Sequence, residues 1–143
     1  MTNNWSRWNP ETARGALAHY VKPATVGSLL HLPGASNQAP MARLREVYTA
    51  LAAKRIRYSF EHDASQPGRQ VIRPPEQILG TPGHGTCLDL AVTMAGACKL
   101  AGLASMVIVV ESDHAPAARH ALVGVFVAAS ATPYPLTGDV HDE

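Results

Sequence analysis

The spacing of apolar residues predicts two long helices in this chain. Between residues 41 and 55, apolar side chains recur every three or four positions, which is typical of an amphipathic helix: Leu44, Val47, Tyr48 and Leu51. From 87 to 101 nearly every position is apolar, so we expect a helix that neighbours bury on several sides. Gly102 follows it and suits the left-handed residue that ends many helices.

Strands are predicted mainly in the second half of the chain. The runs 105–110 and 120–127 are rich in valine, and we expect two strands, the first of them buried, separated by a loop over 111–118. Apolar residues alternate from 56 to 60, which favours a short strand. Residues 70–73 precede a proline and are therefore also expected to be extended.

The remaining segments are predicted to be short helices and loops. Helices are expected over 10–20, 26–32 and 74–80, the last opened by consecutive prolines. Polar or turn-forming residues predict loops in four places: 33–40, 61–68, 81–85 and 128–143. Together these elements predict an α+β fold, with a helical and loop extension over 1–40 and the core over 41–143.

Composition is that of an ordinary soluble domain with enough apolar residues for a core. Of the 143 residues, 46% are hydrophobic and 16% charged, and the net charge is +1. Acidic and basic residues are interspersed, so nothing suggests binding to nucleic acid or to an anionic membrane. No apolar run approaches the roughly 18 to 20 residues of a bilayer span, and no signal peptide is apparent. We therefore expect a cytoplasmic protein.

The two cysteines, Cys87 and Cys98, are expected to be free thiols with different environments. Eleven residues apart on one helix, they are separated by about 16 Å, which is too far for a disulfide. Cys98 falls inside the apolar helix and is expected to belong to the core.

Cys87 stands where a helix start favours the thiolate. Thr86 and Asp89 have the spacing of a capping box, in which each side chain accepts a hydrogen bond from the other residue's backbone N–H. Cys87 is then the first helical residue, where free N–H groups and the helix dipole stabilise negative charge on sulfur or on an oxyanion. From this spacing alone, a small buried cysteine under a capped helix is an equally good interpretation.

Three histidines are candidates for a base that would activate Cys87. His120 is expected to open an apolar strand, which is a rigid platform for an imidazole. His114 falls in a predicted loop, and His84 in a glycine-rich turn three residues before Cys87. His84 and Cys87 also have the spacing of metal ligands, but zinc sites generally need two such pairs. We expect neither a metal nor a cofactor.

Four sequence segments, in this order, resemble bacterial transglutaminase-like domains. They are RQVIRPPEQIL at 69–79, GTCLDLA at 85–91, AGL at 101–103 and HALVGV at 120–125, within a resemblance that spans residues 41–127. The resemblance implies a papain-like core, in which a helix carrying the nucleophile packs on a small antiparallel sheet carrying the histidine. By position, it assigns the nucleophile to Cys87 and the base to His120, ahead of the purely structural interpretation.

The third member of the expected triad is not evident in the sequence. In the family it is an acidic or amide residue, and the acid lies on the strand after the histidine strand. Here Asp139 is the candidate, within a proline-containing tail. We expect instead that the acid lies beyond residue 143 and that the chain is a segment of a larger multidomain protein. Gln70 is a candidate for oxyanion support.

The resemblance implies thiol-based acyl transfer on a protein or peptide substrate. Hydrolysis by a peptidase or amidase is favoured over cross-linking, because most bacterial relatives resemble peptidases. The alternative is a catalytically inactive module of the same fold, which would bind a partner protein or adjoining domains within a larger bacterial regulatory or defence protein.

Overall fold

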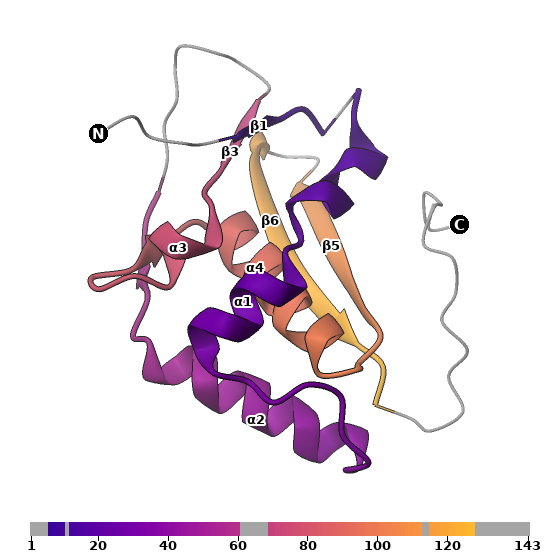
Figure 1. Cartoon of the computed structure of the whole chain (residues 1–143). Helices are drawn as coiled ribbons and strands as arrows, with labels where there is room; N and C mark the ends of the chain where they lie inside the picture. The colour runs from indigo at the N-terminus through magenta and orange to yellow at the C-terminus, as the bar shows by residue number, and fades with distance from the viewer. Residues whose placement is uncertain (1–5, 11, 61–68, 113–114, 128–143) are drawn as a thin grey trace.

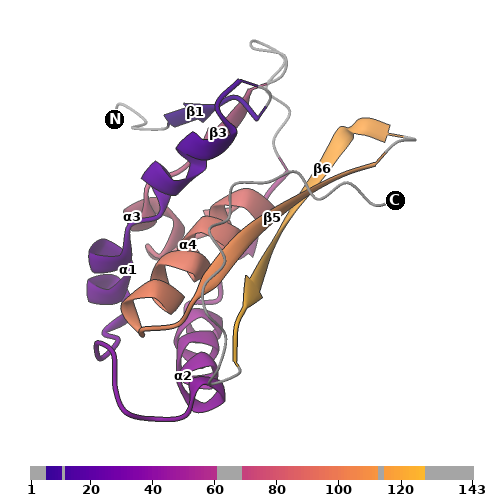
Figure 2. The same ribbon diagram turned by 90° about the vertical axis from the view of Figure 1, so that its right-hand side faces the viewer.

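One buried helix, α4 (Cys87–Leu100), organises the chain. The computed structural model describes residues 6–10, 12–60, 69–112 and 115–127. Helix α1 (Pro23–Leu30) covers one side of α4, and a hairpin of β5 (Ser105–Ser112) and β6 (Ala115–Val125) covers the other (Figure 2). Helix α2 (Pro40–Ala53) packs near the C-terminal end of α4 (Figure 1). The chain is therefore an α+β protein.

The other elements are short and lie around the start of α4. They are β1 (Ser6–Trp8), the 3-10 helix η1 (Arg14–Tyr20), β2 (Arg57–Tyr58), β3 (Gln70–Ile72), α3 (Pro75–Ile78) and β4 (His84–Gly85). The strands form three two-stranded sheets: β1 with β3 and β5 with β6 are antiparallel, and β2 with β4 is parallel. None of the helices in these ranges is both long and apolar enough to cross a bilayer.

Both ends of α4 are fixed by the residues that the sequence indicates. The Thr86–Asp89 capping box is present at the N-terminus. At the other end Gly102 has a φ of 71°, and the N–H of Leu103 donates to the Cys98 carbonyl oxygen at 2.9 Å, which forms a Schellman motif. Arg43 of α2 donates to the Ala101 and Gly102 carbonyl oxygens at 2.7 and 3.0 Å. These bonds satisfy carbonyl groups that the helix itself leaves free.

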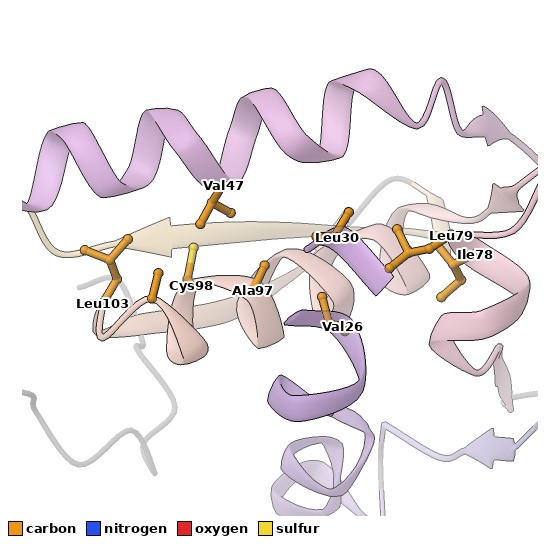
Figure 3. Close-up of a cluster of buried hydrophobic side chains, with 9 residues drawn as sticks. Val26, Leu30, Val47, Ile78, Leu79, Ala97, Cys98 and Leu103 are labelled. Atoms are coloured by element: carbon orange, nitrogen blue, oxygen red, sulfur yellow. The ribbon is translucent and has the colours of Figure 1, made fainter. Parts of the chain in front are cut away.

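The main core lies where α1, α2, α3 and α4 meet (Figure 3). Cys98 is completely buried in it, and its sulfur points toward Val47 of α2. The prediction that Cys98 belongs to the core is confirmed, and both cysteines are free thiols. The buried members of this cluster are Val26, Leu30, Val47, Ile78, Leu79, Ala97, Cys98, Ala101 and Leu103. Residues of α1 thus share the core with those after residue 40.

The predicted helices over 26–32, 41–55 and 74–80 are present as α1, α2 and α3, and the predicted extended segment over 70–73 is β3. The N-terminal helix is different, because it begins only at Arg14 and is of the 3-10 type. Before it, the Asn9 side chain accepts from the Thr12 N–H at 3.3 Å and the Asn9 carbonyl from the Ala13 N–H at 3.0 Å. This turn takes the donors that an earlier helix start would use.

The hairpin corrects the prediction of a loop over 111–118. Strand β5 continues to Ser112 and β6 begins at Ala115, so His120 lies within a strand and does not open one. The antiparallel pairing extends the ladder beyond the valine-rich runs from which the strands were predicted. Residues 84–85 of the predicted loop 81–85 likewise form a strand, while the predicted strand over 56–60 is only two residues long. The predicted loops over 61–68 and 128–143 lie outside the described residues.

Only one face of the hairpin is covered by α4, so the expectation that the first strand is buried is wrong in part. Ser105 donates to the Ala95 carbonyl oxygen at 3.5 Å, and Ala121 and Val125 pack against the buried clusters. Successive side chains of a strand point to opposite faces, so the residues between these inward-facing ones point away from α4. Among them Ile108 and Leu122 remain 41% and 56% exposed.

The Schellman motif at Gly102 gives a test of this architecture. Gly102→Ala should lower the free energy of unfolding by about 1 to 2 kcal/mol, because alanine is strained at positive φ. In addition, its Cβ would lie 2.8 Å from the Cβ of Ala35. Urea denaturation measures the change. Gly34→Ala is the control, since an added Cβ there has no neighbour within 4 Å, and an equal stability of the two variants would contradict the assignment.

Candidate active site around Cys87

A buried carboxylate holds the start of α4 in place. Asp89 is completely buried and accepts three hydrogen bonds: from the Arg73 backbone N–H at 2.8 Å, the Arg73 guanidinium at 2.6 Å and the Thr86 N–H at 3.0 Å. The Thr86 hydroxyl in turn accepts from the Asp89 N–H at 3.4 Å. The contact with Arg73 was not predicted, and it ties the chain after β3 to the first turn of α4.

Cys87 is the first residue of α4, as the capping box predicts, and its side chain is half-buried. Its sulfur lies 3.9 Å from the carbonyl oxygen of Arg119 in β6. The cysteine therefore touches the backbone of the strand at the residue next to His120. Cys87 belongs to the first turn of α4, and the free N–H groups of a first turn stabilise negative charge.

His120 lies in β6, on the opposite face of the strand from its neighbour Ala121. It lies opposite Val110 in the hairpin and is exposed to solvent, whereas Ala121 packs against the buried cluster near Leu88. No hydrogen bond joins the His120 ring to the Cys87 sulfur, both of which the structure describes. The fold thus brings Cys87 to the His120 segment of β6 without placing the ring on the sulfur.

Tyr58 is a site residue that the sequence did not reveal. Strand β2 pairs with β4, and Tyr58 lies opposite Gly85, two residues before Cys87. Its side chain interacts electrostatically with that of Cys87. Desolvation raises the pKa of Tyr58, and the charge and hydrogen-bonding capacity of a nearby Cys87 thiolate raise it further. Alternation over 56–60 predicts the strand, but no local signal predicts its pairing with β4.

The other predicted residues lie farther from this contact. Gln70 is half-buried in β3, where it pairs with Trp8, and it has no hydrogen bond to Cys87 in the described structure. His84 is exposed in β4, opposite Arg57. His114 and Asp139 lie outside the described residues. Within the described ranges, no three His, Cys, Asp or Glu side chains form a cluster that could hold a metal ion.

Compared with known proteins, the chain matches no family model, no curated protein and no solved structure.

Removal of the buried carboxylate should unfold much of the site. Asp89→Ala breaks the buried ion pair between Asp89 and the Arg73 guanidinium, and removal of one partner of such a pair costs about 3 to 5 kcal/mol. Urea denaturation measures it. Glu76→Ala is the matched control, because Glu76 is an exposed carboxylate in α3. A loss no larger than that of the control would show that the ion pair contributes little.

The electrostatic interaction between Tyr58 and Cys87 predicts a shift in a tyrosine titration. Cys87→Ala removes the thiolate that raises the pKa of Tyr58, so this pKa should fall toward its ordinary value, although desolvation remains. Absorbance of tyrosinate near 295 nm follows the titration, with Tyr58→Phe subtracted to isolate the one residue. An unchanged curve would mean that the two side chains are not in contact.

Proposed function

We propose that this chain is a transglutaminase-like thiol hydrolase, a peptidase or amidase with Cys87 as nucleophile and His120 as base. The observation that carries the proposal is the position of Cys87. It begins a capped helix, and its sulfur rests against β6 at the residue adjoining His120. The packing of α4 on an antiparallel hairpin supports the papain-like core that belongs to this proposal.

The proposed reaction is acyl transfer through a thioester. His120 takes the Cys87 proton, and the thiolate attacks the carbonyl carbon of a peptide or a glutamine side chain. A C–S bond forms and the carbonyl π electrons move onto oxygen, next to the first-turn N–H groups of α4. As the C–N bond breaks, the imidazolium protonates the leaving amine. Water, deprotonated by His120, then hydrolyses the thioester, and the proton returns to sulfur.

The imidazole has to turn toward sulfur for this chemistry. The ring is exposed, and catalytic hydrogen bonds are often formed only once substrate is bound. An acid that fixes the tautomer completes the proposed triad. The proposed acid is Asp139, which lies outside the described residues.

The proposed setting is the cytoplasm, where free thiols such as those of Cys87 and Cys98 stay reduced. The proposed partner is a protein or peptide substrate. The net charge of +1 offers no support for a nucleic acid or membrane partner.

Turnover of p-nitrophenyl acetate tests the assignment. His120→Ala should lower the rate about 100-fold, because it removes the general base, whereas His84→Ala should leave it unchanged. Mass spectrometry locates the acetyl group, which we expect on Cys87. Cys98 is an internal reference, since burial raises its pKa to about 11 and keeps it a thiol. Equal rates for the two histidine variants would remove His120 from the mechanism.

A non-catalytic module that binds a partner protein is the second candidate. The outer face of the hairpin favours it, because apolar side chains there are open to solvent: Ile108, Val110 and Leu122. His120 lies among the same outward positions. If Cys87 is not acylated in the unaltered protein while a Cys87→Ala variant keeps full partner binding, this second function replaces the first.

A further inference from the structure

We propose that the groove between α2 and β6 binds a straight-chain fatty acid, with the alkyl chain between the two elements and the carboxylate on Arg45. The groove reaches α4 at Met94, and its volume is about 580 Å³. Pockets that hold small molecules are generally about 300 to 1,000 Å³. Cys87 is not among the residues that line it, so this inference goes beyond the proposed acyl-transfer function and does not depend on it.

The groove has two elongated walls. One wall is α2, and the other is the end of β6, which lies beside α2 in Figure 2. On α2 the lining residues extend from Met41 to Thr49, about 12 Å along the helix axis. On the strand side they extend from Val123 to Val127, about 13 Å of extended chain. Walls of this length suit an unbranched chain better than a compact ring system.

The lining is apolar where it is most covered. Four half-buried residues line the groove, and three of them also pack against the main core: Leu44, Met94 and Val125, with Val123 the fourth. Met41 is 48% exposed at the groove. The flexible side chains of methionines such as Met41 and Met94 adapt to a ligand of variable shape. Burial of CH₂ groups against these residues would supply most of the affinity.

Arg45 determines the charge of the proposed ligand. It is the one charged residue among those that line the groove, and it is exposed. Its side chain has no ion pair or hydrogen bond with another residue of the described ranges. The hydroxyl groups of Tyr48 and Thr49, which also line the groove, can donate to a carboxylate held there. An apolar groove whose single charge is positive is complementary to an apolar chain that ends in an anion.

Titration calorimetry with laurate, below its micelle concentration, tests the proposal. We expect the affinity to rise about two- to fourfold with each CH₂ group added from octanoate to laurate, because the groove buries the chain. Dodecyltrimethylammonium has the same chain length and a positive head group, so it should bind more weakly than laurate. Absence of laurate binding, equal affinity for the two head groups, or no dependence on chain length would overturn the proposal.

Arg45→Gln tests the contact with the carboxylate. It should weaken laurate binding about three- to tenfold and leave the binding of uncharged 1-octanol unchanged. Arg57→Gln is the matched control, because Arg57 is also exposed but lies in β2 and does not line the groove. Thermal unfolding of the unliganded variants shows whether either substitution disturbs the fold. Equal affinities for laurate in the two variants would overturn the role of Arg45.

Methionine methyl signals in NMR spectra locate the ligand. Laurate should shift the signals of Met41 and Met94, whereas Met106 of β5, which does not line the groove, is the internal reference. A shift of Met106 alone would place laurate on the hairpin and contradict the proposal. If the first two signals shift with protein concentration and not with laurate, a second copy of the chain covers the groove, and the fatty-acid site is wrong. Acylation of Cys87 is measured separately, so each of these outcomes leaves the proposed function standing.

Discussion

The candidate site depends on the buried carboxylate of Asp89. A buried charge is costly unless it is paired and fully hydrogen-bonded, and here the Arg73 guanidinium and two backbone N–H groups satisfy it. These donors come from the segment after β3 and from the residue before α4. Both segments must therefore come together before the carboxylate is stabilised. Cys87 lies within this joint, so its position follows from the same requirement.

Local signals made α4 the most predictable part of the chain. Its start is encoded by Thr86 and Asp89, and its end by Gly102, all within a few residues of the helix they bound. Its apolar sequence on every side indicated burial, and the structure confirms it. The helix over 41–55 was predictable for a similar reason, since the spacing of its apolar residues repeats over several turns.

Contacts between distant segments could not be predicted in this way. Nothing near Tyr58 indicates that it pairs with β4, and nothing near Asp89 identifies Arg73 as its partner. The length of the hairpin was missed because strand pairing, not apolar content, extends it past the valine runs. The same error made His120 appear to open a strand. Its role as the base is the proposal that the position of Cys87 against β6 supports.

The two thiols on α4 give the chain an uneven sensitivity to oxidation. Cys98 is sealed in the core, whereas Cys87 is half-buried at the surface of the helix start. A sulfenic acid formed on Cys87 would have no second thiol of this chain within reach, because about 16 Å of helix separates the two sulfur-bearing residues. Repair of such damage would have to come from a thiol supplied by another molecule, and without it oxidation would proceed to the irreversible sulfinic acid.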